Sequence, residues 1–383
     1  MMFRGFVREE GVGVRNYVAV ICTVGCAAHV VRKIVEANPR AKAIIHHQGC
    51  CHVPPEISHV EKVLINLALN PNVHSALFVS LGCEGVSAEK VADEVSKFKE
   101  AEVVRILDEG TSKAISKGSR IVEKMLVEAE KMNREEVALS ELKLAIKCGG
   151  SDFTSGIVSN PVAGKVADLI IDNGGTVIFG ETTEVIGAEH IVARRAASEE
   201  VAQKLYKAVE SMEQRVIAMG VDMRKGQPTP GNIRGGITTI EEKSIGAVCK
   251  AGSSKLIDVV DYGDIVKERG LIFMDTPGRE LEVLTGFAAG GAQITLFTTG
   301  LGVPQGYPIM PVVKISGNPE TCKKLSEHID VDLSKVFYGE ESIEAAAKRV
   351  LNEILEVASS KKTKAELLGY EDTVEIYVRG PVI

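Results

Sequence analysis

The sequence of 383 residues has no tryptophan, few aromatic residues and no excess of basic charge. Aromatic residues make up 4% of the chain, and the formal net charge is -7. Proteins that bind nucleic acid usually combine basic patches with aromatic side chains that stack on bases. The composition therefore argues against a protein that binds nucleic acid.

Long apolar segments are also missing. No run approaches the roughly 20 apolar residues that a membrane-spanning helix needs. Residues 1–10 are charged and lack the apolar core of a signal peptide. We therefore expect a cytoplasmic protein that does not contact a membrane. In a reducing compartment, the eight cysteines are expected to be thiols or metal ligands rather than disulfides.

Signatures of zinc ribbons and nucleotide sites are absent as well. Cys22 and Cys26 are separated by three residues, so they do not form the CxxC pair of a ribbon-type zinc site. No Gly-x-Gly-x-x-Gly follows the first apolar run, and no Gly-Lys-Ser/Thr occurs in the glycine-rich region. A nucleotide-binding α/β protein is therefore a weaker interpretation.

What the sequence does contain is a regular alternation of short apolar runs and amphipathic segments. This alternation predicts an α/β fold, with a doubly wound, mostly parallel sheet domain followed by a second α/β domain. A polar segment at 133–136 predicts a boundary between residues 1–134, a domain with strand-end cysteines, and residues 135–383, which we expect to form a C-terminal catalytic domain. The main predicted strands are 17–21, 42–45, 76–81, 102–107, 142–147, 176–179, 271–274, 294–297, 311–315 and 374–378. The main predicted helices are 27–37, 57–69, 87–99, 111–133, 160–172, 198–219 and 342–359.

Cysteines follow the predicted strands at several places. Cys26, Cys50 and Cys83 end the turns after three strands of the first domain, and Cys148 closes the first strand of the second. Ligands of open α/β sheets bind at the carboxyl ends of the strands. Thiolates there could hold an iron ion or an iron–sulfur cluster and leave one position open for substrate. The alternative for each cysteine alone is a small residue in a crowded turn.

Acid–base candidates stand at similar positions. His46, Glu181 and Glu184 each follow a predicted strand, and these side chains can transfer protons near neutral pH. The alternatives are a solvent-facing histidine and a favourable charge at a helix N-terminus. Because Cys148 and the two glutamates come from the second domain, we expect a site in a crevice between the two domains.

Residues 231–244 are dense in glycine, hydroxyl and charged side chains. Backbone amides, Arg234 and Lys243 could bind an anionic substrate there, with a surface loop as the alternative. Asp275 follows another apolar strand and adds a carboxylate.

Motifs in both halves resemble the altronate/galactarate dehydratase family, in the right order and over almost the whole chain. Those of the first half are Gly13-Val14-Arg15-Asn16-Tyr17, Thr23-Val24-x-Cys26, His46-x-x-Gly49-Cys50 and Gly82-Cys83-Glu84. Those of the second half begin at Cys148, Ser159, Gly180, Gly231, Glu242, Met274 and Phe297. Residues 330–334 differ from the Asp-x-Asn-Ala-Gly that is usual in the sugar-acid enzymes, which leaves the substrate open.

The resemblance implies a hydro-lyase that removes water from a sugar acid such as altronate or galactarate and requires iron. The family also contains sulfolactate sulfo-lyase large subunits, which eliminate sulfite from a 2-hydroxy acid in the same manner. Long members carry a small extra N-terminal domain, so we expect a separate small subunit here, and an oligomer.

The expected mechanism is a metal-assisted β-elimination. Iron held by the strand-end cysteines would polarise the substrate carboxylate or the leaving hydroxyl. Glu181, Glu184 or His46 would take the proton, with Lys243 as a further catalytic group. The expected substrate-binding residues are Arg15, Asn232, Arg234 and Asp275. The rival from another class is a non-enzymatic metal-binding subunit whose partner performs the chemistry.

Overall fold

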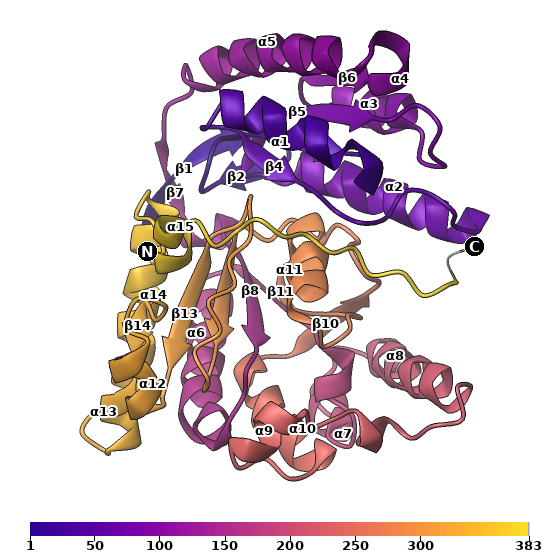
Figure 1. Ribbon diagram of the computed structural model, residues 1–383. Coiled ribbons are helices and arrows are strands. Elements are labelled where there is room, and N and C mark those ends of the chain that lie inside the picture. Colours follow the sequence, from indigo (N-terminus) through magenta and orange to yellow (C-terminus); the bar gives the residue numbers. More distant parts are fainter. Residues whose placement is uncertain (382) are drawn as a thin grey trace.

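A computed structural model describes residues 1–381 and 383, and it shows two parallel sheets and one small antiparallel sheet (Figure 1). The smaller parallel sheet has the order β4-β3-β5-β6, and the larger has the order β10-β11-β9-β8-β12-β13-β14. The antiparallel sheet has the order β2-β1-β7. The α/β prediction is therefore confirmed.

The first domain is built on the four-stranded sheet. Its strands are β3 (Tyr17–Cys22), β4 (Lys42–Ile44), β5 (Val73–Ser80) and β6 (Ala101–Arg105). Its main helices are α1 (Ala28–Ala37), α2 (Pro54–Leu69), α3 (Ala88–Ser96) and α5 (Thr111–Ala129). The predicted strand 102–107 ends early, because Ile106–Glu109 form the short helix α4.

The second domain is built on the seven-stranded sheet. Its strands are β8 (Lys143–Cys148), β9 (Thr176–Phe179), β10 (Leu256–Val260), β11 (Gly270–Met274), β12 (Ile294–Thr298), β13 (Val312–Ser316) and β14 (Val331–Asp332). All the neighbouring pairs are parallel. Because β8 and β9 are neighbours in the middle of this sheet, the turns that follow them meet.

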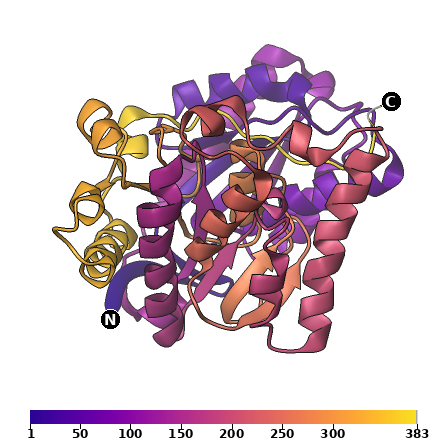
Figure 2. The ribbon, with the colours of Figure 1, turned by 90° about the horizontal axis from the view of Figure 1, so that it is seen from below.

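Helices connect these strands. The longer ones are α6 (Asn160–Asp172), α8 (Glu199–Ile217), α10 (Ile240–Val248), α11 (Glu280–Ala289) and α14 (Ile343–Ala358). The shorter ones are α7 (Glu189–Ala193), α9 (Pro230–Arg234), α12 (Pro319–Lys324), α13 (Ser334–Phe337) and α15 (Lys364–Leu368). Figure 2, which views the molecule from below, shows α9 and α10 in front of the sheet. Among the described residues, no helix has the length and apolar character needed to cross a membrane.

The two domains share part of their core. Along β8, Ala145 belongs to one apolar cluster, while Leu144 and Ile146 belong to another, so both faces of the sheet are buried. The cluster of Ala145 also contains residues of α11, α2 and one face of the four-stranded sheet. Helices α2 and α11 therefore lie between the two sheets, with α6 and α14 beyond the larger sheet and α1 and α5 beyond the smaller one.

The predicted strand 374–378 is wrong. The C-terminal segment is extended and runs along the boundary between the domains, where it is yellow in Figure 1. Val374 and Ile376 are buried, which explains the alternating apolar pattern. The backbone of Ile376 and Tyr377, however, bonds to the side chains of Gln48, His59 and Tyr262 rather than to a neighbouring strand.

Five strands were not predicted. Two of them, β10 and β14, lie at the two edges of the larger sheet. The other three form the antiparallel sheet: β1 (Met2–Arg8), β2 (Gly11–Gly13) and β7 (Glu135–Ala138). Strand β1 pairs with both of the others, so the chain start joins the segment that links the two domains.

Candidate active site

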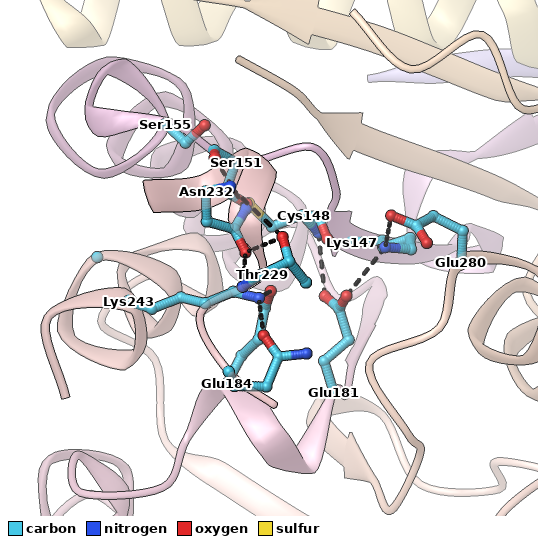
Figure 3. Close-up of polar contacts among 12 residues, drawn as sticks. Lys147, Cys148, Ser151, Ser155, Glu181, Glu184, Thr229, Asn232, Lys243 and Glu280 are labelled. Atoms are coloured by element: carbon cyan, nitrogen blue, oxygen red, sulfur yellow. Dashed lines mark hydrogen bonds and ion pairs between the residues drawn. The ribbon is translucent and has the colours of Figure 1, made fainter. Parts of the chain in front are cut away.

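The carboxyl ends of β8 and β9 and the helix α10 place several charged side chains together, mostly out of contact with solvent (Figure 3). We call this group the buried charge cluster; it consists of Lys147, Glu181, Glu184, Lys243 and Lys250. Lys147 lies within β8, and the glutamates lie in the turn after β9. Lys243 lies on α10, and Lys250 follows that helix.

Lys250 is the centre of the cluster. Its Nζ lies 2.6 Å from Glu181 Oε2 and 2.6 Å from Glu184 Oε2. Lys147 Nζ donates to the other oxygen of Glu181 at 3.0 Å. Lys243 Nζ lies 3.4 Å from Glu184 Oε1. Three lysines thus surround two carboxylates, which are buried only because they are paired.

Glu181 is held in an unusual backbone conformation. Its φ is 68°, in the left-handed region that few residues other than glycine occupy. The backbone N–H of Glu181 donates to Thr276 Oγ1 at 2.7 Å, and its carboxylate accepts the backbone N–H of Cys148 at 3.0 Å. A backbone conformation of this kind costs about 1–3 kcal/mol, and such strain is common at functional sites. The two hydrogen bonds help to offset this cost.

The environment separates the pKa values of the two glutamates. Burial and the neighbouring Glu184 carboxylate raise the pKa of Glu181. Burial acts in the same direction on Glu184, but the ammonium groups of Lys250 and Lys243 outweigh it and lower the pKa of Glu184 to about 2. Burial lowers the pKa of Lys250, yet the two carboxylates raise it overall, so Lys250 remains charged. Glu184 is thus an ionised carboxylate at neutral pH.

A cavity of about 280 Å³ lies beside the cluster. Cys148 and Lys243 form part of its wall, together with Ser151, Asp152 and Asn160. Burial raises the pKa of the Cys148 thiol, whose Sγ lies 2.6 Å from Ser151 Oγ. Ligand cavities usually measure about 300–1,000 Å³, and this one lies just below that range, so only a small molecule would fit. The ammonium of Lys243 at the wall favours an anion.

Two of the predicted substrate-binding residues adjoin the site, but their side chains are engaged within the protein. Asn232 Nδ2 donates to the carbonyl of Ser151 at 2.9 Å, so it holds the turn after β8. Asp275 accepts hydrogen bonds from Thr182 Oγ1 at 2.6 Å and from Arg379 at 2.8 Å. Asn232 and Asp275 therefore support the turns on which the site is built. Arg234 lies exposed on α9.

Arg15 lies elsewhere. Its guanidinium pairs with Glu366 at 2.9 Å and donates to the backbone carbonyls of Val357 and Lys361, each at 2.8 Å. All its nitrogens are engaged in this structure, where Arg15 joins the C-terminal helices to β3.

His46 is buried, and both of its ring nitrogens are engaged. Nδ1 accepts the backbone N–H of Gln48 at 3.1 Å, which leaves Nε2 as the donor to the carbonyl of Cys22 at 2.8 Å. Burial lowers the pKa of His46 to about 4. This neutral ring has no free lone pair for a substrate proton in the arrangement seen here.

The three cysteine-bearing turns of the first domain contact one another. Gly85 N donates to the carbonyl of Gly49 at 3.1 Å, and Thr23 Oγ1 donates to Glu84 at 2.5 Å. The thiols of these turns, Cys26, Cys50 and Cys83, are exposed. Within residues 1–381 and 383, no three His, Cys, Asp or Glu side chains are arranged to hold a metal ion.

The structure thus does not unite all the candidates in one crevice. Glu181, Glu184, Lys243 and Cys148 come together at the larger sheet. Among the described residues, no hydrogen bond or ion pair joins them to Cys26, Cys50 or Cys83.

The prediction missed two members of the cluster, Lys147 and Lys250. Lys147 interrupts the apolar run Leu144–Ile146 of β8, and a lysine in a strand buried on both faces requires a partner. That signal was available in the sequence. Lys250 follows Cys249 at the end of α10, and no local pattern distinguishes it from a surface lysine.

Comparison with known proteins covers both domains. Residues 5–130 match the family model described as D-galactarate dehydratase/altronate hydrolase, second domain. Residues 139–380 match the model described as D-galactarate/altronate dehydratase, C-terminal.

Individual relatives agree with these matches. The chain is 32% identical to an altronate dehydratase of Bacillus subtilis over 381 residues, which are 97% of this chain and 76% of the relative. It is 32% identical to a galactarate dehydratase (L-threo-forming) of Escherichia coli, over 99% of this chain and 77% of the relative. It is 35% identical to a (2R)-sulfolactate sulfo-lyase subunit beta of Chromohalobacter salexigens, over 97% of this chain and 96% of the relative. The chain therefore belongs to the D-galactarate/altronate dehydratase family.

Proposed function

We propose that this protein is a hydro-lyase that eliminates water from a sugar acid such as altronate or galactarate. The observation that carries the proposal is the buried charge cluster beside a small cavity, at the strand ends where α/β proteins bind ligands. The dehydratase relatives support it, because they match both domains. They also favour an enzyme over the non-enzymatic subunit.

The reaction breaks two bonds of the sugar acid. A base removes the proton on the carbon next to the carboxylate, and the hydroxyl group on the following carbon leaves as water after it gains a proton. A carbon–carbon double bond forms, and the resulting enol becomes a 2-keto acid. Removal of the first proton places extra negative charge on the carboxylate, so the site must offer positive charge there.

Lys243 and Glu184 are suited to these two tasks. The Lys243 ammonium at the cavity wall pairs with the substrate carboxylate and stabilises its increased charge. Glu184, which is ionised and lies behind the Lys243 ammonium rather than at the cavity wall, accepts the proton once Lys243 turns towards the substrate. Because Lys243 helps to lower the pKa of Glu184, a shift of Lys243 from Glu184 to the substrate makes Glu184 a stronger base. Lys250 and Lys147 keep the remaining charges of the cluster paired.

Iron is part of the proposal, but no step depends on it. Thiolates suit iron, and Cys26, Cys50 and Cys83 lie on turns that contact one another. The thiols do not form a ligand set in this structure, and Cys148 lies in the other domain near the charge cluster. Bound iron would supply a Lewis acid. Iron content that is equal in the wild type and in Cys50→Ser would contradict a role of Cys50 as a ligand.

A sulfo-lyase is the second candidate. The relative named (2R)-sulfolactate sulfo-lyase subunit beta matches this chain over 96% of its own length, compared with 76% for the Bacillus dehydratase. The same proton removal would then expel sulfite instead of water.

An anaerobic assay with added iron tests the proposal on altronate, galactarate and sulfolactate. Formation of a 2-keto acid without sulfite supports the hydro-lyase. Release of sulfite from sulfolactate alone supports the second candidate. No elimination from any 2-hydroxy acid, also with the small subunit present, contradicts both.

A cytoplasmic location, an oligomeric state and a separate small subunit also belong to this proposal. They are testable by fractionation, by light scattering and by co-purification.

A further inference from the structure

The ammonium of Lys243 has an acceptor outside the buried charge cluster. Lys243 Nζ donates to Gln227 Oε1 at 2.9 Å, whereas it lies 3.4 Å from Glu184 Oε1. Direct hydrogen bonds between an ammonium and a carboxylate measure about 2.7–2.9 Å, so the contact with Glu184 is a looser ion pair. The amide of Gln227 thus holds the ammonium more closely than the Glu184 carboxylate does.

Gln227 lies on a segment that is tied to the wall of the cavity. It stands two residues before Thr229, which caps α9, and the backbone N–H of Thr229 donates to Asn232 Oδ1 at 3.0 Å (Figure 3). Asn232 in turn donates to the carbonyl of Ser151 at 2.9 Å, and Ser151 lines the cavity. These bonds fix the backbone close to Gln227, so its amide reaches Lys243 from a supported position.

The acceptor that Gln227 offers is neutral, which suits a site for an anionic substrate. An amide oxygen accepts a hydrogen bond without adding a negative charge, so Lys243 keeps its attraction for a carboxylate in the cavity. A carboxylate at position 227 would instead form a full ion pair with Lys243 and repel the substrate. The side chain of Lys243 is 10% exposed, so solvent and salt screen these charges only in part.

We propose that Gln227 is a positioning residue for the elimination. It holds the Lys243 ammonium at the cavity wall and keeps it from forming a direct hydrogen bond with Glu184. The ammonium is thereby available to the substrate carboxylate, and its transfer to the substrate frees Glu184 to accept the proton. The inference rests on the proposed function, because Gln227 acts on the reaction only through Lys243.

Loss of the amide therefore has a defined consequence. Without Gln227 as acceptor, Lys243 Nζ should settle on Glu184 Oε1 at hydrogen-bonding distance, since this oxygen is already in contact with it. The substrate carboxylate must then displace Glu184 before it can bind. Because a hydrogen bond to a charged group changes an equilibrium by about tenfold or more, KM should rise by about tenfold. The bound complex keeps its contacts, so kcat should change by less than about twofold.

Three variants of the full chain test the inference. Gln227→Met keeps the length of the side chain and removes the acceptor, whereas Gln227→Glu keeps an acceptor and adds a negative charge. Gln203→Met is the matched control, because Gln203 is an exposed glutamine on α8. Crystal structures give the distance from Lys243 Nζ to Glu184 Oε1, and urea denaturation compares the stability of the variants. KM and kcat are measured anaerobically, with added iron, on whichever of altronate, galactarate and sulfolactate the wild type converts.

We expect the distance between Lys243 and Glu184 to shorten from 3.4 Å to about 2.8 Å in Gln227→Met, with the rise in KM given above. In Gln227→Glu the distance should not shorten, but KM should rise at least as much, because the added charge competes with the substrate. The control should keep the wild-type distance, KM and kcat.

An unchanged distance or an unchanged KM in Gln227→Met would overturn the inference. Equal losses of kcat and of stability in both Gln227 variants would also overturn it, because they would show that Gln227 only maintains the fold of its segment. The distance is measured independently of turnover. If the wild type converts none of the three acids, the proposed function fails, while a shortened distance in Gln227→Met still supports the hold of Gln227 on Lys243.

Discussion

Replacement of Lys250 by methionine tests whether the buried charge cluster is held together as described. The change keeps the length of the side chain but removes the ammonium that lies 2.6 Å from both Glu181 and Glu184. The side chain of Lys250 is 1% exposed, so water cannot replace it without rearrangement. Two carboxylates then share a buried site with too little positive charge.

Two independent arguments give the size of the effect. Removal of one partner from a buried ion pair typically destabilises a protein by about 3–5 kcal/mol. Lys250, Lys243 and Lys147 together lower the pKa of Glu184 from 4.5 to about 2 against the effect of burial, which corresponds to about 3 kcal/mol for the three lysines combined. We therefore expect Lys250→Met to lower the free energy of unfolding by about 3 kcal/mol or more.

Urea denaturation followed by circular dichroism measures this loss. Lys255→Met is the matched control, because Lys255 is exposed nearby, and its cost should stay within about 0.5 kcal/mol. Glu184→Gln in the Lys250→Met background should restore part of the loss, since it removes one unpaired carboxylate. A loss below about 1 kcal/mol in Lys250→Met would refute the reasoning.

Three further predictions concern other parts of the molecule. Because the pKa of Glu184 is lowered in the folded state, the stability that this carboxylate contributes is present above pH 4.5 and is lost as the pH falls towards 2. The free energy of unfolding, measured as the pH is lowered over this range, should therefore fall less in Glu184→Gln than in the wild type. His46→Asn leaves the buried carbonyl of Cys22 unpaired, so the free energy of unfolding should fall by about 1–3 kcal/mol while kcat is kept; a large loss of kcat at unchanged stability would point to a catalytic His46. Arg379→Met removes the ion pairs with Asp261 and Asp275, so hydrogen exchange in residues 370–381 should become faster by about tenfold; unchanged exchange would show that apolar contacts alone hold the segment.

Much of the fold could be predicted, because most strands are short apolar runs buried on both faces. Strand β9 lies where the prediction put it, since Val177 and Phe179 pack on one face and Ile178 on the other. The C-terminal segment shows the limit of this signal. Val374 and Ile376 alternate as in a strand, but their burial between two domains depends on partners far away in the chain.

The site could be predicted only in part. The position after a strand was enough to find Glu181 and Glu184, because parallel strands bring such turns to one edge. The same rule also selected His46, although its ring serves the first domain by holding the turn after β4. Which strand ends share a site depends on the packing of the two sheets. Lys250 comes to the cluster because the turn after α10 packs on α6 and β8 within the second domain, and no local pattern reveals it.

The most direct test of the central claim is the rate of elimination by Lys243→Met. Lys243 is the one member of the buried charge cluster, as described here, that also lines the cavity. With the sugar acid that the wild type converts, we expect kcat/KM to fall by about 100-fold or more, whereas the exposed control Lys225→Met keeps the wild-type value. Wild-type kcat/KM in a folded Lys243→Met variant would contradict the claim that elimination takes place in this cavity.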